Sequence, residues 1–197
     1  TQAWNPHPVV AVAGGLDSEG QPRRAFGIAC RATVEEAAAK AWLEWAQSLQ
    51  YADYMRRNRG DELPTDPQLL RRFEEHATFY TLRPELWNRI PLIQGRRPAR
   101  RRHIPAAQVP ASPCARLEAL TMALSRADIE LYYRELTAPD VAEAGVRVVR
   151  VLAPQLNPLH ADERAPFLGG RCADVQWRYP GEEPLTDFPN SFPHPLG

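Results

Sequence analysis

The sequence lacks net charge, because its 24 lysine and arginine residues are balanced by 24 aspartate and glutamate residues. Without a field of one sign there is no overall attraction to nucleic acid or to an anionic membrane. No apolar run reaches the roughly 18 residues that span a bilayer, and residues 1–10 lack the basic start and apolar stretch of a signal peptide. The sequence therefore predicts a soluble, cytoplasmic protein that binds neither nucleic acid nor a membrane.

Cysteine is also scarce, and Cys30, Cys114 and Cys172 lie far apart, outside any CxxC or Cys/His cluster. This spacing argues against a disulfide framework and a zinc site, and predicts reduced, structural cysteines. The chain has no Walker P-loop, no GxGxxG after a strand, no GxSxG and no HExxH, and the five histidines show no metal-binding spacing. Common hydrolase and dehydrogenase chemistry is therefore not indicated.

The most informative segment is 27–47, GIACRATVEEAAAKAWLEWAQ, which predicts an Ala-rich helix. Glu36, Lys40, Glu44 and Gln47 fall within an arc of about 80° on this helix, and Lys40 is the only lysine of the chain. The stripe has two interpretations: a binding surface, or a solvated face with i,i+4 Glu/Lys pairs. Thr33 and Glu36 form a capping-box pattern, so Glu36 has a rival role at its own helix N-terminus. The opposite side is predicted to face the core and carries Ala38, Trp42, Trp45 and Leu49.

Local signals predict the remaining elements of a single α/β or α+β domain, a mixed sheet with amphipathic helices packed on it. Residues 58–111 are polar and Pro-rich, which indicates an insertion or mobile loop, and the basic run 96–102 within them is read as a solvated loop rather than a site for phosphate or an acidic peptide. The predicted elements are strands over 9–13 and 24–30 joined by the turn GGLDSEGQP, helices over 66–79, 112–126 and 137–144, and strands over 129–136 and 146–152, followed by an irregular region over 154–197.

Four segments carry a further pattern: FGIACRATVEEAAAKAWLEWAQ, YYRELTAPDVAEAGVRVVRVLAPQLNPLH, PFLGGR and PNSFPHPLG. The first is similar to a glycine-led strand followed by a helix with E-x3-[RK]-x3-E-x2-Q, and the last to a Pro-rich N-x-x-PHPFP terminus. In this order they resemble the C-terminal part of a YcaO-domain protein, closest to the azoline-forming cyclodehydratase branch. The S-x3-E-x2-E helix of that family's N-terminal half is absent from residues 1–197.

The resemblance implies an enzyme that uses ATP and Mg²⁺ to activate peptide backbone amides. A Cys, Ser or Thr side chain of a precursor peptide attacks the preceding carbonyl, ATP phosphorylates the oxyanion, and loss of phosphate gives a thiazoline or oxazoline. By position, Glu36, Glu44 and Gln47 are the expected Mg²⁺/ATP ligands. Lys40 is expected to contact phosphate or to orient the two glutamates. Arg171 is expected to contact phosphate or substrate, or to form an interior ion pair.

The Pro-rich tail, residues 188–197, is expected to run back over the domain, where Pro193, Pro195 and Gly197 lie near the substrate. Proline fixes φ and extends the preceding residue, so this end is stiff. A disordered Pro-rich end is the alternative. The sequence ends in PHPLG rather than PHPFP, which leaves other YcaO chemistries such as thioamidation open.

The absent first motif predicts that residues 1–197 form the C-terminal part of a YcaO domain. The expected partners are the N-terminal half, from the same gene or a split chain, a precursor peptide, a leader-peptide-binding protein and a second copy in a homodimer. The alternative is a degenerate relative that serves as a non-catalytic module binding a peptide or a partner.

Overall fold

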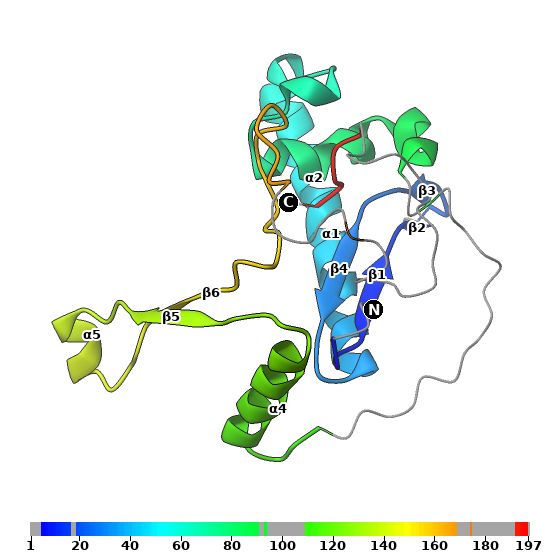
Figure 1. Cartoon of the computed structure of the whole chain (residues 1–197). Helices are drawn as coiled ribbons and strands as arrows, with labels where there is room; N and C mark the ends of the chain where they lie inside the picture. Colours follow the sequence, from blue (N-terminus) through cyan, green and yellow to red (C-terminus); the bar gives the residue numbers. More distant parts are fainter. Residues whose placement is uncertain are drawn as a thin grey trace.

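A hairpin and one long helix form the centre of the molecule (Figure 1). The computed structural model describes residues 5–16, 19–90, 93, 109–168, 174 and 192–196. Strand β1 (Val9–Val12) pairs antiparallel with β4 (Gly27–Cys30), and helix α1 (Val34–Arg59) packs on both strands. The short pair β2 (Gly15–Leu16) and β3 (Pro22–Arg23) lies within the connection. The predicted hairpin leading into a helix is therefore confirmed.

Helix α1 begins where its sequence signals place it, because the Thr33 side chain accepts a hydrogen bond from the Glu36 N–H at 3.2 Å. Its buried residues are Ala37, Ala41, Ala52 and Met55. The predicted core side is wrong at Trp42, which is 52% exposed. The strand approaches so closely that only small side chains fit between it and the helix.

A second layer is built by residues that follow α1. Helix α2 (Phe73–Leu82) packs against α1, preceded by the 3-10 helices η1 (Gly60–Glu62) and η2 (Pro67–Leu69) and followed by η3 (Pro84–Arg89). The predicted helix over 66–79 is wrong in its first half, because the chain is extended at Leu70 and the Glu75 carboxylate accepts the N–H groups of Arg71 and Arg72 where α2 begins.

The main buried cluster also lies in this layer. Residues 67–90 supply five of its six side chains: Leu70, Phe79, Tyr80, Trp87 and Ile90, which join Phe26. Residues 67–90 therefore form helices that bury apolar side chains, while the insertion or mobile loop over 58–111 stays a prediction. The basic run 96–102 lies outside the described residues.

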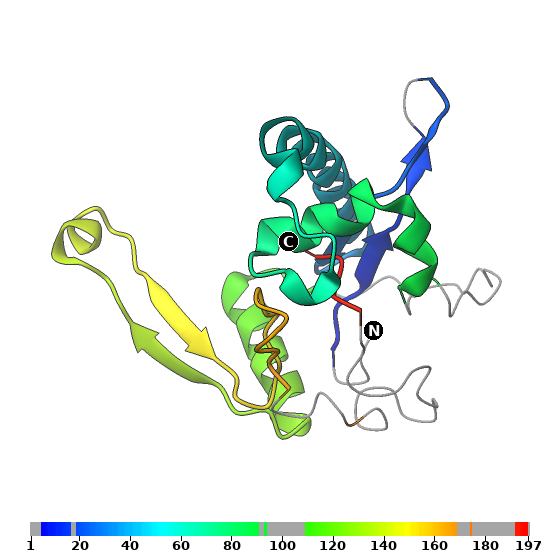
Figure 2. The same cartoon turned by 90° about the horizontal axis from the view of Figure 1, so that it is seen from above.

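The third part is an arm that extends from the body in both views (Figures 1 and 2). Helix α4 (Pro113–Arg126) leads into the antiparallel pair β5 (Tyr132–Glu135) and β6 (Val149–Leu152), with α5 (Pro139–Glu143) at its tip. Ser112 caps α4, and Gly145 follows α5 with a φ of 76°. Every residue of β5 and β6 is exposed in this chain.

The fold is α+β, as the sequence allowed. The predicted mixed sheet is wrong for the described residues, since their strands form three separate antiparallel pairs. No helix in the described part of the chain combines the length and apolar character that a membrane crossing requires. The C-terminal residues 192–196 return to the body and lie beside α2 (Figures 1 and 2), where the Tyr80 hydroxyl donates to the Pro193 carbonyl at 2.8 Å.

Candidate functional site

A cavity of about 710 Å³ lies where β4, α1, α2 and the C-terminal segment meet. Three of the predicted stripe residues, Lys40, Glu44 and Gln47, line it together. Leu196 also lines it, so the C-terminal segment reaches the same cavity. The other lining residues are Phe26, Ile28, Ser48, Gln50, Tyr51, Tyr54, Ala77 and Leu159.

Glu44 is held in place from two sides. Its Oε2 accepts the backbone N–H of Ile28 on β4 at 3.2 Å, and its Oε1 lies 3.2 Å from Nζ of Lys40 one turn earlier on α1. About a third of each side chain is exposed, 34% for Glu44 and 37% for Lys40. The hairpin and the helix thus fix the direction of this carboxylate, while both charges stay accessible from the cavity.

Glu36 is separated from the other stripe residues, because it is exposed in the first turn of α1 and is not part of the cavity lining. Its backbone N–H is bonded to Thr33. Among the described residues, its carboxylate takes part in no hydrogen bond or ion pair. The structure therefore brings together three of the four stripe residues and leaves Glu36 one turn away.

The cavity lining offers donors of the type that a magnesium nucleotide requires. Mg²⁺ prefers oxygen ligands, which the Glu44 carboxylate and the Gln47 side-chain amide provide, and Lys40 supplies a positive charge for phosphate oxygens. The chemical types of these three side chains therefore fit ATP with Mg²⁺. Their single carboxylate accounts for only part of a cage around Mg²⁺ and a triphosphate.

The C-terminal segment is anchored next to this cavity. Pro193 is buried and accepts the Tyr80 hydroxyl, and burial raises the pKa of Tyr80 well above its usual value. His194 stacks on His76 with 4.2 Å between ring centroids, and burial lowers the pKa of His194. A disordered end does not describe residues 192–196. Arg171 and Gly197 lie outside the described residues, and the predicted roles of Pro193 and Pro195 near substrate stay predictions.

Sequence reasoning missed the aromatic half of the cavity wall. Tyr51 and Tyr54 continue the stripe from Glu44 and Gln47 with the same spacing of three and four residues along α1. Because α1 runs to Arg59, this extension of the i, i+3, i+4 pattern was the signal available in the sequence. Phe26 and Leu159 also line the cavity, but they are outside α1, and no sequence pattern indicates that they contact this helix.

Comparison with known proteins gives one family match. A sequence model of the family described as YcaO cyclodehydratase, ATP- and Mg²⁺-binding, matches residues 3–157. No curated protein and no solved structure matches the chain. The matched residues include both strands of the central hairpin and all of α1, so they contain Lys40, Glu44 and Gln47. The chain therefore belongs to the YcaO family, whose domain implies ATP-dependent activation of amides.

Proposed function

We propose that this chain carries part of an ATP- and Mg²⁺-dependent site that activates backbone amides of a ribosomally made precursor peptide, with thiazoline or oxazoline rings as products. One observation carries the proposal: Lys40, Glu44 and Gln47 line a single cavity in a chain of a family described as binding ATP and Mg²⁺. Amide activation is the general reaction, and azoline formation is the specific outcome that we propose. The support for azoline formation is the resemblance of the C-terminal residues to the azoline-forming branch.

The residues that line the cavity have different roles, which follow from their chemical types. Glu44 and Gln47 would hold Mg²⁺ through oxygen atoms, and Lys40 would contact phosphate oxygens. When bound, ATP would supply a phosphoryl group to the amide oxygen with release of ADP, so that this oxygen can leave as phosphate. The Ile28 N–H holds Glu44 before any ligand binds, so less ordering is needed at the moment of binding. Phe26 and Leu196 give the cavity an apolar side.

A complementing half completes this proposal. Among the described residues that line the cavity, Glu44 is the one carboxylate, which is too few to balance a magnesium triphosphate complex, and Glu36 lies outside that lining. The missing carboxylates would come from an N-terminal YcaO half, carried by the same gene or by a separate chain. A leader-peptide-binding protein would present the precursor peptide to the assembled site.

A second candidate is a non-catalytic module that binds a peptide or a partner. The observation in its favour is that both oxygens of Glu44 already have partners, namely Ile28 N–H and Lys40. A carboxylate so engaged serves equally well to hold α1 on β4. In this case the cavity would accept an apolar or aromatic side chain between Tyr51, Tyr54 and Leu196.

The mass of the peptide product distinguishes azoline formation, thioamidation and a non-catalytic role. The chain is combined with a complementing YcaO half, a precursor peptide, ATP and Mg²⁺, and the peptide is analysed by mass spectrometry. Azoline formation removes one water for each ring, whereas thioamidation exchanges an oxygen atom for sulfur. We expect water loss with the natural sequence and with Glu118→Gln, a control on the exposed face of α4, and none with Glu44→Gln. Unmodified peptide with an assembly that binds it would favour the non-catalytic module.

A further inference from the structure

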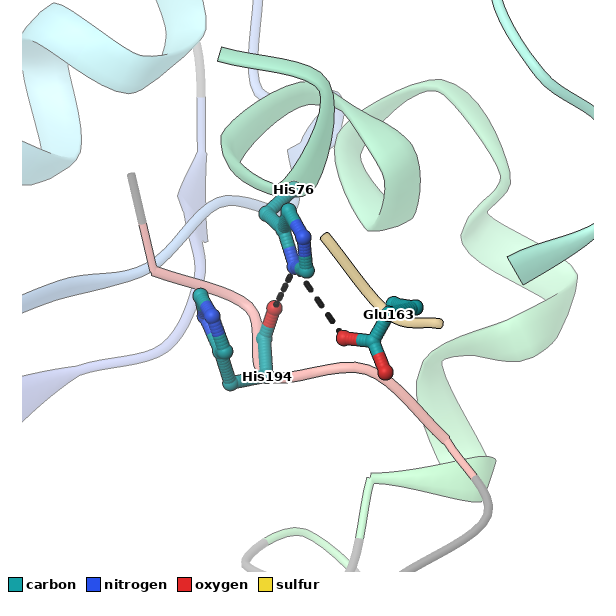
Figure 3. Close-up of side chains that lie close together, drawn as sticks. All are labelled: His76, Glu163 and His194. Carbon is teal, nitrogen blue, oxygen red and sulfur yellow. Dashed lines mark hydrogen bonds and ion pairs between the residues drawn. The ribbon is translucent and has the colours of Figure 1, made fainter. Parts of the chain in front are cut away.

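Three segments that are distant in sequence bring metal-ligating side chains together beside α2 (Figure 3). His76 comes from α2, Glu163 from the loop after β6, and His194 from the C-terminal segment. One ligand atom from each lies within 4.8 Å of the others. His76 is completely buried, and the Glu163 side chain is 16% exposed.

The hydrogen bonds fix which nitrogen of each ring carries a proton. Nε2 of His76 lies 2.9 Å from the Ala161 carbonyl, and Nε2 of His194 lies 2.7 Å from the His160 carbonyl. A carbonyl oxygen can only accept, so both Nε2 atoms are protonated and a neutral ring has its lone pair on Nδ1. Metal-binding histidines commonly have this arrangement, with the other ring nitrogen donating to a backbone carbonyl.

Among the described residues, two oxygen atoms are the close polar neighbours of Nδ1 of His76. Glu163 Oε1 lies 3.5 Å away, and the His194 carbonyl lies 3.3 Å away (Figure 3). A lone pair facing two oxygen acceptors is unfavourable, and a cation bound between these atoms would relieve the repulsion. The His194 ring stacks nearly parallel to the His76 ring, at 12°.

We propose that His76, Glu163 and His194 bind a divalent transition metal ion of the zinc type, which clamps the C-terminal segment onto α2. Two imidazoles and one carboxylate suit Zn²⁺, and the 3.5 Å between His76 Nδ1 and Glu163 Oε1 is close to the separation of two ligands at about 2.0–2.2 Å from one ion. His194 must move toward the other two ligands, exchanging its 3.3 Å contact with the Leu196 N–H for the metal. A fourth position is left for water.

The site is independent of the cavity that the proposed function uses, although the two are connected through the chain. The metal would fix His194, and Leu196 two residues later lines the cavity next to Lys40. Glu163 and His194 both lie outside the residues matched by the family. The spacing of the histidines along the sequence gave no sign of this site, because its ligands come from positions 76, 163 and 194.

The test is metal uptake by the full chain. The protein is stripped with a chelator and dialysed, Zn²⁺ is titrated by calorimetry, and Co²⁺ is added separately to record the visible absorption of its ligand field. We expect one ion per chain, a nitrogen- and oxygen-ligated Co²⁺ spectrum, and a Zn²⁺-dependent rise in the thermal unfolding midpoint. His7→Ala, which removes a histidine outside the cluster, should leave all three results unchanged.

The ligand variants decide the outcome. His194→Ala and Glu163→Gln alter partly exposed positions, and circular dichroism establishes that they fold. Each should weaken Zn²⁺ binding by about 100-fold or more and abolish the Co²⁺ spectrum. Failure of the folded natural chain to take up Zn²⁺ would overturn the proposal. Equal uptake by His194→Ala would overturn it as well.

Discussion

Replacing Gly27 with alanine tests the contact on which the candidate site is built. Gly27 is the first residue of β4 and is buried against α1. An added Cβ would lie 2.0 Å from the Ala41 carbonyl oxygen and 2.5 Å from the Trp45 backbone nitrogen. Both neighbours are backbone atoms, so no side-chain rotation can relieve the clash.

The magnitude follows from these distances. Ordinary contact begins near 3.4 Å, so strand and helix must separate by about 1.4 Å, the difference between 3.4 and 2.0. Overpacking of this kind costs about 1–3 kcal/mol, and a backbone clash on two sides places Gly27→Ala near 3 kcal/mol. For a chain of this size that corresponds to a fall in Tm of roughly 6–12 °C. The same movement would stretch the adjacent hydrogen bond from the Ile28 N–H to Glu44.

The assay is urea unfolding followed by tryptophan fluorescence, with Gly60→Ala as the matched control. Gly60 has a helical φ of −55°, and an added Cβ would meet nothing within 4 Å. Gly60→Ala should therefore be neutral or stabilise by up to about 1 kcal/mol, since alanine restricts the unfolded chain. Equal unfolding midpoints for the natural chain and Gly27→Ala would refute the close approach of β4 and α1.

Two further predictions concern α2 and the C-terminal segment. Phe79→Ala should lower the free energy of unfolding by about 3–5 kcal/mol, because Phe79 is 1% exposed within the main cluster. Leu117→Ala, at a side chain that is 63% exposed, should change it by less than about 0.5 kcal/mol. Similar denaturation curves for both variants would contradict the burial of Phe79 and favour the mobile-loop interpretation of this region. Tyr80→Phe removes the hydrogen bond to the Pro193 carbonyl, so the segment should detach about fivefold more often, for a cost of about 1 kcal/mol. Hydrogen exchange of the Leu196 amide, which donates to Nδ1 of His194 in the attached segment, measures this opening, and an unchanged exchange rate would contradict the anchoring.

Local signals predicted much of the secondary structure because their physical causes are local. Thr33 and Ser112 accept backbone N–H groups at helix starts, and Gly145 has the positive φ that ends α5. The Val-rich run over 146–152 predicted a strand, which forms over Val149–Leu152. These features depend on residues within one turn or one hairpin.

The errors arise where packing between distant segments decides the outcome. The helical pattern placed Trp42 on the core side, but the approach of Gly27 selects the alanine face instead. The polar composition of 58–111 concealed the apolar residues that α2 and η3 bury. Likewise, Lys40, Glu44 and Gln47 could be grouped from helical spacing, whereas Leu196 and Phe26 join them only through the tertiary fold.

The most direct test of the central claim is calorimetric titration of ATP with Mg²⁺ into the chain assembled with a complementing N-terminal YcaO half. The account predicts binding by the natural sequence and by Glu118→Gln, weak or no binding by Glu44→Gln in the same assembly, and weak or no binding by the isolated chain. Equal affinity of Glu44→Gln and the natural sequence would contradict the assignment of Glu44 to the nucleotide site.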